Sequence, residues 1–368
     1  MRIALIVPGG VDRSAEYRII PALLALIERL ARAHDVQVIA LSQERTPGDW
    51  PLAGAHVHNI GARHTRRRAL QTLLGLHRRA PFDLTQAIWS GWCGLIAVGA
   101  SRLLGIPSLV HVAGGELMDL PAIAFGGSRN WRGRLRERLT LRSATRVTAA
   151  SAPIIASIAA LGARAQRVPL GVDRTAWPDR PPRPRNPGSI ARLIHVASLN
   201  RVKDQPTLLR ALALLGQRGV EFQLDLVGED TLGGQIEALA AQLGLSSRVV
   251  FHGFLPQRQV RPLIEAADLM VISSRHEAGP IVALEAAAVG VPTVGTTVGH
   301  LAEWAPHAAL AVPVGDAEAL AEAVGRVLRD EPLRLRLAQE AQQRAWREDA
   351  DWTARRFEAL YAEVAGTP

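Results

Sequence analysis

The sequence predicts an α/β protein with two doubly wound, Rossmann-like domains followed by C-terminal helices. Three observations predict this class. Short β-branched runs alternate with longer amphipathic runs; the alternation stops in a stretch with five prolines, residues 176–190, and restarts; and residues 317–364 have helix-forming composition. In such parallel sheets ligands bind outside the carboxyl ends of the strands. Two facing domains therefore predict a site in the cleft between them.

The first domain is expected at residues 1–175, where apolar runs of strand length precede amphipathic runs of helix length. Its strands are predicted at residues 3–7, 36–41, 87–89, 108–112 and 147–149, and its helices at 15–33, 70–79 and 95–104. Prolines cannot continue a helix or a central strand, so residues 176–190 are predicted to be an interdomain linker.

The second domain is expected at residues 191–345, because the same alternation restarts there. Its strands are predicted at residues 193–199, 222–227, 249–251, 269–273 and 292–295, with helices at 232–243 and starting at Pro206 and Pro280. Further helices are expected at residues 317–328, 333–346 and 353–364. Residues 346–368 are expected to form a separate C-terminal helix. Whether this helix crosses back to the N-terminal domain stays open.

Positive charge is concentrated in the first half of the chain. Residues 1–190 hold 26 Arg against 12 acidic residues, whereas residues 191–368 hold 17 Lys and Arg against 22. The arginines are densest at residues 63–68, 77–79 and 129–142. Such a face favours an anionic membrane surface or a lipid-linked partner, with a merely solvated face as the alternative. No nucleic-acid-binding motif is visible, so no nucleic-acid partner is expected.

The chain has one cysteine, Cys93, and no apolar run long enough for a signal-peptide core or a spanning helix. We therefore expect a cytoplasmic protein, with a peripheral position at the inner face of the plasma membrane as the further expectation. The Asp-x-Asp at residues 349–351 is interpreted as the start of a helix and not as metal ligands. No metal site is expected.

The strongest candidate site contains two carboxylates, Glu277 and Glu285, behind an apolar strand. Gly279 permits close approach of the backbone, and Pro280 suits the first position of a helix. A helix start is an anion site, and Glu285 one turn later suits the paired hydroxyls of a ribose. Glu285 lies in an apolar run, where an unpaired carboxylate is costly to bury. The pattern favours nucleotide binding.

Residues 168–314 resemble the family 4 retaining glycosyltransferases of the GT-B fold. The resemblance is carried by the order and spacing of Val168-Pro-Leu-Gly-Val-Asp173, Val196-Ala-Ser-Leu-Asn-Arg-Val-Lys-Asp204, Leu226-Val-Gly-Glu229, Phe251-His-Gly-Phe-Leu255, Glu277 to Glu285, and Gly290-Val-Pro292. It implies transfer of a sugar from a nucleotide diphosphate donor, with retention of configuration and no required metal or cofactor. A UDP- or GDP-sugar is expected, and the sequence does not indicate which base the donor carries.

The same resemblance implies roles for individual residues. Lys203, the only lysine in the chain, matches the lysine that neutralises the donor phosphates. Glu285 matches the ribose-binding acid, and Glu277 the acid beside the transferred sugar. Backbone groups near the donor are implied at Phe254, Leu255, Gly279, Pro280, Ile281, Gly9 and Gly10. Ser198 stands where the family usually has an arginine, and we expect Arg201 to supply that cation.

Three residues of the first domain are weaker candidates for contact with the acceptor or the sugar: His111, Glu116 and Arg13. Many family members have a histidine where this chain has Ala113, and His111 lies two residues earlier in the same strand. A core histidine is the alternative interpretation. Glu116 follows paired glycines and is a candidate for sugar or acceptor contact.

We expect an anionic or lipid-linked glycan acceptor, as in the synthesis of cell-envelope or exported polysaccharides. Two alternatives of the same fold stay open: a nucleotide-sugar 2-epimerase, which needs no acceptor, and a catalytically silent protein that binds a nucleotide sugar. A dinucleotide-dependent oxidoreductase is disfavoured, because neither half has Gly-x-Gly-x-x-Gly after its first strand.

Overall fold

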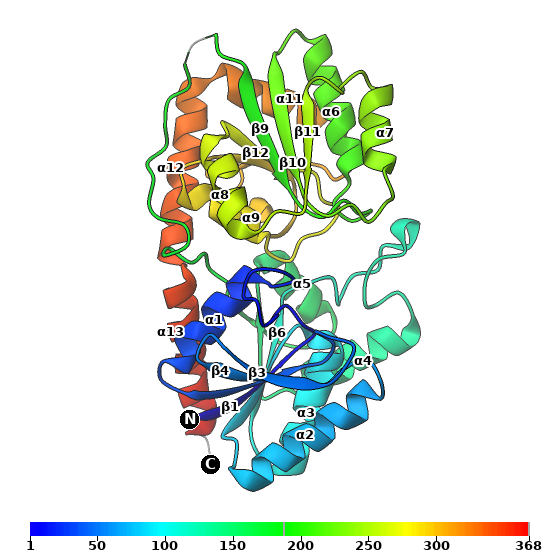
Figure 1. Ribbon diagram of the computed structural model, residues 1–368, viewed down its shortest axis with the longest axis vertical. Helices are drawn as coiled ribbons and strands as arrows, with labels where there is room; N and C mark the ends of the chain where they lie inside the picture. Colours follow the sequence, from blue (N-terminus) through cyan, green and yellow to red (C-terminus); the bar gives the residue numbers. More distant parts are fainter. Residues whose placement is uncertain (187, 367–368) are drawn as a thin grey trace. The chain divides into compact units, whose positions relative to one another are not determined.

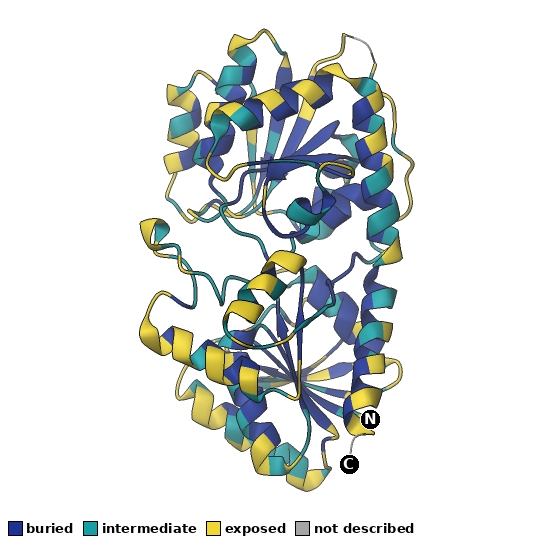
Figure 2. Cartoon of the chain, turned by 180° about the vertical axis from the view of Figure 1, so that it is seen from behind, coloured by how far each residue is buried: buried dark blue, intermediate teal, exposed yellow. Residues whose placement is uncertain are grey.

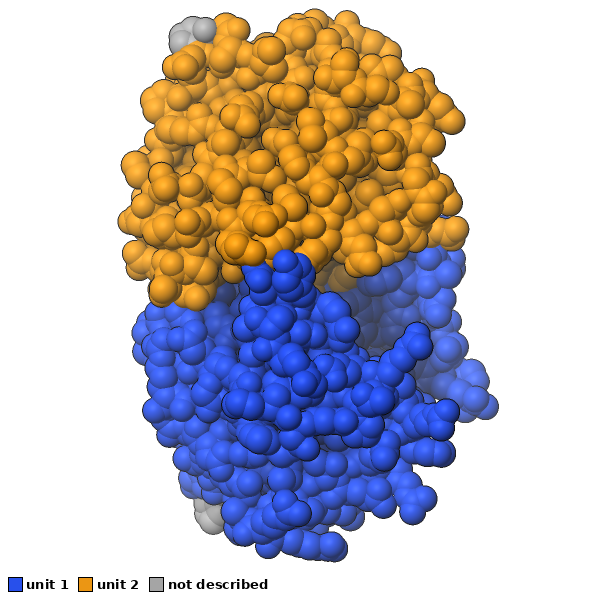
Figure 3. All heavy atoms as spheres, viewed as in Figure 1, with its two compact units in different colours: residues 1–171, 350–368 blue, residues 172–349 orange. Residues whose placement is uncertain are grey.

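The computed structural model describes residues 1–186 and 188–366, and its contacts divide the chain into two units (Figures 1 and 3). The first unit comprises Met1–Gly171 and the C-terminal residues from Ala350 onward; the second comprises Val172–Asp349. Each unit is built on its own sheet, with buried strands between helices (Figure 2). The prediction of two Rossmann-like α/β domains is confirmed.

In the described part of the first unit, eight strands form a sheet in the order β3-β4-β2-β1-β5-β6-β7-β8. All neighbours are parallel except β3 and β4, which form an antiparallel edge hairpin. The strands are β1 (Arg2–Val7), β2 (Asp35–Ala40), β3 (Gly48–Leu52), β4 (Ala55–Asn59), β5 (Leu84–Ile88), β6 (Ser108–Val112), β7 (Arg146–Ala149) and β8 (Gln166–Arg167). The helices are α1 (Pro21–Ala31), α2 (Thr65–Arg79), α3 (Leu95–Leu104), α4 (Trp131–Ser143), α5 (Ala152–Ala160) and α13 (Ala350–Ala365), with short turns η1 (Ser90–Gly94) and η2 (Pro121–Ile123).

Side chains of the central strand β1 point alternately to the two faces of the sheet, and both faces are buried. Ala4 and Ile6 of β1 pack into a cluster with Leu73 of α2 and Ala97 of α3. Helix α13 packs against α1, where Arg29 Nε lies 2.7 Å from Asp351 Oδ1. Asp351 is therefore a partner of Arg29, so this part of the Asp-x-Asp sequence serves the helix interface.

The described second unit contains six parallel strands in the order β11-β10-β9-β12-β13-β14. They are β9 (Ala191–Val196), β10 (Phe222–Val227), β11 (Val249–Gly253), β12 (Leu269–Ile272), β13 (Thr293–Thr296) and β14 (Leu310–Val312). The helices are α6 (Gln205–Gln217), α7 (Gln235–Gln242), α8 (Gln257–Ala266), α9 (Ile281–Ala288), α10 (Gly299–Trp304), α11 (Ala317–Arg329) and α12 (Glu331–Arg347). Leu193 and Ile194 of β9 face opposite apolar clusters, one containing α6 and α11, the other α9 and α12.

The proline-rich stretch expected as a linker belongs to the second unit in the structure. Trp177 is 1% exposed and packs in the apolar cluster that includes residues of α9. Arg183 and Arg185 pair with the buried Asp268 at 3.4 and 3.2 Å. Prolines prevent secondary structure here but not packing, and the buried tryptophan and the ion pairs hold the segment against the unit. Pro187 lies outside the described residues.

Two of the differences between the expected and the observed first unit have a clear physical reason. The helix predicted from residue 15 begins at Pro21, because Ala15 and Arg18 adopt positive φ angles of 55° and 52°, which a helix cannot accommodate. The hairpin β3–β4 was not predicted, since its sequence mixes Pro51 with histidines and lacks an apolar run. The hairpin forms because β4 pairs with β2.

Candidate functional site

The candidate site in the second unit is built from the loops that follow β9 and β12. These strands are parallel neighbours in the sheet, so residues 197–204 and 273–280 leave it at the same edge. Figure 1 shows both strands ending on the side of α9. The sequence places the predicted lysine in the first loop and the predicted acid Glu277 in the second.

Three contacts join the two loops. The backbone N–H of Arg275 donates to the carbonyl of Val202 at 2.7 Å, and Ser273 Oγ donates to the carbonyl of Lys203 at 2.8 Å. Arg275 Nε lies 3.1 Å from Oδ2 of Asp204, which is only 4% exposed. The two loops are therefore held as one piece before any ligand arrives.

Lys203 and Glu277 meet directly in this piece. Lys203 Nζ donates to Glu277 Oε1 at 2.6 Å, and Ser274 Oγ donates to the same oxygen at 2.6 Å. The two side chains are 25% and 14% exposed, so they are half-buried and still open to a ligand. Because the pair is partly exposed, Lys203 can leave Glu277 and bind a phosphate that enters the site.

A buried histidine, His195, lies at the end of β9 beneath the lysine loop. Burial lowers the pKa of His195 to about 4, against the hydrogen bond to the Val271 carbonyl, which raises it, and with a smaller lowering by the Lys203 charge. The ring is therefore neutral at physiological pH: Nδ1 donates to the Val271 carbonyl at 2.8 Å, and Nε2 accepts from Gln205 Nε2 at 3.2 Å. Gln205 also donates to the Ser198 carbonyl at 3.1 Å. His195 thus ties β9 to β12 and to the lysine loop.

Sequence reasoning missed the positioning role of His195. Its one signal was a histidine inside the apolar run at residues 193–199. A buried imidazole needs partners for both nitrogens, and these come from Gln205 of α6, ten residues away, and from Val271 of β12, 76 residues away.

Glu285 lies on α9 and is 6% exposed. Burial raises its pKa to about 7, against the hydrogen bond that Gln257 Nε2 donates to Oε1 at 2.9 Å. Gln257 is the first residue of α8 and follows Phe254 and Leu255, the residues expected near the base. The hydrogen bond therefore links the predicted ribose acid to the predicted base loop.

The start of α9, with Gly279, Pro280 and Ile281, packs against Gly299, the first residue of α10. Gly299 has a φ of 46°, and a Cβ there would lie 2.9 Å from Pro280 Cδ and 3.0 Å from the Glu277 carbonyl oxygen. Glycine is therefore needed at position 299 to let the start of α10 support the segment carrying Glu277. The first amides of α9 have no acceptor within the helix itself, as at any helix start.

Ser198 and Arg201 lie on the exposed side of the lysine loop. Among the described residues, no ion pair involves Arg201. The loop is also shaped by Gly228 at the end of β10, whose φ is 151° and where a Cβ would lie 2.0 Å from the Ala197 carbonyl oxygen. Only glycine permits this approach.

The candidates Gly9, Gly10 and Arg13 follow β1 in the first unit. The Gly10 N–H donates to Gln43 Oε1 at 2.6 Å, so this amide already has an acceptor. Arg13 donates to both oxygens of Glu44, at 3.1 and 3.0 Å, and its guanidinium lies 4.8 Å from the centre of the Trp50 ring. Arg13 is thus occupied by protein groups in this structure.

His111 and Glu116 occupy different surroundings in the first unit. His111 is fully buried, bonded through Nδ1 to Thr148 Oγ1 at 2.9 Å and edge-on to Phe357, and burial lowers its pKa to about 3. Glu116 accepts from the Ser90 N–H at 3.0 Å, and burial, with the nearby Glu137 carboxylate, raises its pKa to about 7. The geometry is that of a core histidine, whereas Glu116 lies at the carboxyl ends of β5 and β6.

Comparison with known proteins identifies the class. The profile of the glycosyl transferase 4-like domain matches residues 19–173, and that of glycosyl transferases group 1 matches residues 181–344. Sucrose-phosphate synthase from Thermosynechococcus elongatus superimposes with a TM-score of 0.86 at 19% identity, covering 100% of both chains. HepE of Anabaena, solved with UDP-glucose, superimposes with a TM-score of 0.76 at 19% identity, covering 99% of this chain and 100% of that one. The fold is that of a GT-B glycosyltransferase.

Two curated relatives carry the family assignment. 2-Deoxystreptamine glucosyltransferase of Streptomyces kanamyceticus is 30% identical over 71% of this chain and 72% of that protein. MMP alpha-(1->4)-mannosyltransferase of Mycolicibacterium hassiacum is 32% identical over 81% of this chain and 75% of that protein. This chain belongs to the group 1 glycosyl transferases, glycosyltransferase family 4. Some other alignments are shorter: that with D-inositol 3-phosphate glycosyltransferase of Corynebacterium urealyticum covers 43% of the relative.

Within the part of the chain that the structure describes, no helix combines the length and the apolar character that crossing a membrane requires.

Proposed function

We propose that this glycosyltransferase moves a sugar from a nucleoside diphosphate donor to an anionic or lipid-linked glycan acceptor, with retention of configuration and without a catalytic metal. The observation that carries the proposal is the contact between Lys203 and Glu277, held by two joined loops, with the buried Glu285 on the next helix. The UDP-glucose complex of HepE supports a nucleotide-sugar donor.

The proposed chemistry follows from charge. When the glycosidic bond to the diphosphate breaks, negative charge grows on the leaving phosphates and the anomeric carbon becomes cationic. Lys203 Nζ, already desolvated on one side, would stabilise the phosphates, and Arg201 would add a second cation from the same loop. Glu277 would then face the sugar with its carboxylate. Glu285 would accept hydrogen bonds from the ribose hydroxyls.

Ser198 replaces a cation that family members usually supply at this position. Arg201 is exposed on the same loop, two residues before Lys203. In this proposal the two residues share the leaving-group charge. A guanidinium provides two parallel donors where an ammonium provides a point charge, so the two are not interchangeable.

Helix α4 supports the proposed membrane-surface location. Its buried residues are Gly133, Glu137, Thr140 and Leu141, whereas Trp131, Leu135 and Leu139 are 63%, 46% and 53% exposed. The exposed arginines are Arg132, Arg134, Arg138 and Arg142. An apolar stripe flanked by cations fits the headgroup region of an anionic bilayer, which is the proposed partner of α4. Figure 2 shows α4 largely in the colour of exposed residues.

The unique lysine provides a direct test. Pyridoxal 5′-phosphate followed by borohydride reduction modifies amines, so in this chain it reports on Lys203 and the terminal amine alone. We expect UDP or GDP to protect the Lys203 peptide, measured by mass spectrometry, and a matching nucleotide sugar to do the same. Equal labelling with and without each nucleotide would contradict the assignment.

Turnover separates the proposed reaction from its alternatives. The protein is incubated with UDP- and GDP-sugars and a pool of lipid-linked or anionic glycans. Rapid release of the nucleoside diphosphate should require an acceptor. Without an acceptor, slow hydrolysis alone should release it. Lys203→Ala should abolish turnover and nucleotide binding together, with binding measured by titration calorimetry because this variant has no lysine to label, and Lys203→Arg should retain part of the binding. An epimeric nucleotide sugar formed without acceptor indicates an epimerase, and protection without any turnover indicates a silent binding protein.

A further inference from the structure

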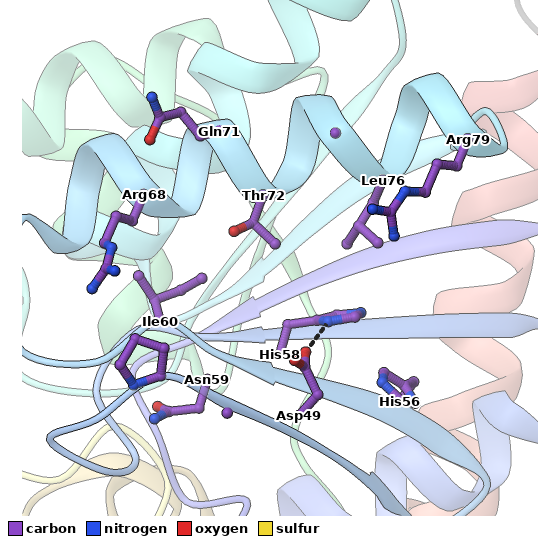
Figure 4. Close-up of a pocket in the computed structure, with 13 residues that line it drawn as sticks. Asp49, His56, His58, Asn59, Ile60, Arg68, Gln71, Thr72, Leu76 and Arg79 are labelled. Atoms are coloured by element: carbon purple, nitrogen blue, oxygen red, sulfur yellow. Dashed lines mark hydrogen bonds and ion pairs between the residues drawn. The ribbon is translucent and has the colours of Figure 1, made fainter.

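A pocket of about 690 Å³ lies in the first unit between the edge hairpin β3–β4 and helix α2 (Figure 4). The strands contribute Asp49, His56 and His58, and the helix contributes Arg68, Gln71, Thr72 and Arg79. All these residues belong to the first unit, whereas the predicted phosphate-binding residues belong to the second. The transferase proposal leaves this pocket unused.

The strand register brings three potential ligand groups together. Asp49 of β3 is directly opposite His58 of β4, and His56 is two residues from His58 on the same strand face. The two imidazole rings lie 4.7 Å apart, and one ligand atom from each of the three residues lies within 4.8 Å of the others. Figure 4 shows the dashed contact from His58 to Asp49, with His56 beside it.

The hydrogen bonds of His58 make this cluster unusual. Nε2 lies 2.9 Å from Gln37 Oε1, and Nδ1 lies 2.5 Å from Asp49 Oδ1. Gln37 presents its oxygen because its own Nε2 donates to Asp35 at 2.6 Å. A neutral imidazole has one N–H group. If Nε2 donates to Gln37, the lone pair of Nδ1 points at a carboxylate with nothing between them.

We propose that Asp49, His56 and His58 bind a divalent transition-metal ion of the Zn²⁺ class. Two imidazole nitrogens and one carboxylate oxygen form a donor set that such ions prefer. The Gln37 bond to His58 is the outer contact that typically fixes the tautomer of a metal-binding histidine. The ion would lie between the Nδ1 lone pair and the carboxylate.

Binding requires the two exposed ligands, Asp49 and His56, to move. Two ligands about 2.0 Å from a tetrahedral Zn²⁺ lie about 3.3 Å apart, so the Asp49 contact must open by less than about 1 Å. The Asp49 side chain is 62% exposed and can turn, whereas His58 is 13% exposed and stays in place. The fourth position would face the pocket, where Arg68 and Arg79 favour an anion or a water as the last ligand.

The bound ion would connect the two strands of the edge hairpin. Between Asp49 and Pro51, Trp50 is buried and its Nε1 donates to the Val11 carbonyl at 3.1 Å, in the loop after β1. Fixing the hairpin would therefore also support that loop. The inference concerns a structural ion and does not depend on the transferase proposal.

The experiment uses the full chain without a histidine tag, treated with a chelator and dialysed at pH 7.5. Titration calorimetry with ZnCl₂ should show one ion per chain, and CoCl₂ should give the visible absorption of a nitrogen-ligated, four-coordinate ion. His56→Ala and His58→Ala should each weaken Zn²⁺ binding at least tenfold. His307→Ala, which removes an exposed histidine of the second unit, should bind as the wild type does.

Thermal unfolding provides a second readout. Zn²⁺ should raise the Tm of the wild type and of His307→Ala and leave that of His56→Ala unchanged. His56 is exposed, so its alanine variant should fold normally in chelator. Equal Zn²⁺ affinity in the wild type and both site variants would overturn the proposal. Absence of stoichiometric Zn²⁺ binding to the wild type would overturn it as well.

Discussion

Lys203 Nζ lies 2.6 Å from Glu277 Oε1, so the single lysine of the chain is held by the acid expected beside the transferred sugar. Ser274 and the joined loops position Glu277 for this contact. A phosphate that reaches Lys203 must compete with this carboxylate or share the ammonium with it. The pair therefore affects both the affinity for the nucleotide and the rate of transfer.

Replacing Glu277 by Gln should separate these two effects. The variant keeps the shape but removes the negative charge, so the free Lys203 should bind a nucleoside diphosphate about tenfold more tightly, equivalent to about 1.4 kcal/mol. Turnover should fall by about a hundredfold, because the sugar loses its facing carboxylate. Calorimetry and initial rates measure both. Ser274→Ala, which leaves the charge in place, should change nucleotide affinity little; weaker binding in Glu277→Gln would contradict the role of the pair.

Glu285→Gln should stabilise the protein above neutral pH while weakening donor binding. The pKa of Glu285 is raised to about 7 by burial, from an ordinary value of 4.5. The unfolded chain loses this proton first, so wild-type stability falls as pH rises from about 4.5 to 7, by about 3 kcal/mol. The variant lacks this loss. Denaturant unfolding at pH 5 and pH 8 tests it, with the exposed Glu318→Gln as control.

His195→Gln should remove the opposite pH dependence. Burial holds the pKa of His195 at about 4, below its ordinary 6.5. The unfolded chain takes up this proton first, so wild-type stability falls as pH drops from about 6.5 to 4, by about 3 kcal/mol. Unfolding measured across this window should show a shallower decline in the variant, and donor KM at pH 7.5 should rise. A decline as steep as in the wild type would exclude His195 as its source.

Replacing the exposed stripe of α4 should release the protein from anionic membranes. Trp131→Ala, Leu135→Ala and Leu139→Ala combined should reduce sedimentation with phosphatidylglycerol vesicles by tenfold or more, since each buried apolar side chain contributes about 1.5–3 kcal/mol. Leu103→Ala, on α3 and 65% exposed, is the matched control. Binding of the wild type should weaken with salt and be absent with neutral vesicles. Equal sedimentation of the triple variant would refute the role of α4.

Gly228→Ala should destabilise the second unit by about 3 kcal/mol or more, because its Cβ would lie 2.0 Å from the Ala197 carbonyl oxygen. Gly244→Ala separates this clash from backbone strain: Gly244 has a φ of 70° but no atom within 4 Å of an added Cβ. We expect that control to cost only about 1 kcal/mol. Thermal unfolding of both variants would show whether the close approach matters.

Much of the fold could be predicted because alternating apolar runs report directly on burial. The strands at residues 108–112 and 222–227 and the helix at 95–104 occupy the expected residues. The hairpin β3–β4 could not be predicted, because its polar sequence becomes a strand pair only by bonding to β2. The buried position of Trp177 likewise depends on the apolar cluster below α9.

Residues of the candidate site could be predicted from the sequence where their type is unusual for the position. Lys203, Glu277 and Glu285 stand out in the sequence because they are rare or costly at their positions. His195 did not, because an apolar strand commonly buries a histidine without functional consequence. Its neutral state, and the hydrogen bonds through which it holds the lysine loop, depend on groups that come together only in the folded chain.

The amino-acid sequence by itself determined the class of fold, the family, and the residue types available at the ends of β9 and β12. These follow from periodicity and from spacing along one strand–loop–helix segment, which are local properties. Only the tertiary structure decided that Lys203 contacts Glu277, that Gln257 reaches Glu285, and that Asp49 meets two histidines. The physical reason is that parallel strands and hairpin register bring together side chains separated along the chain, and burial then sets their charge.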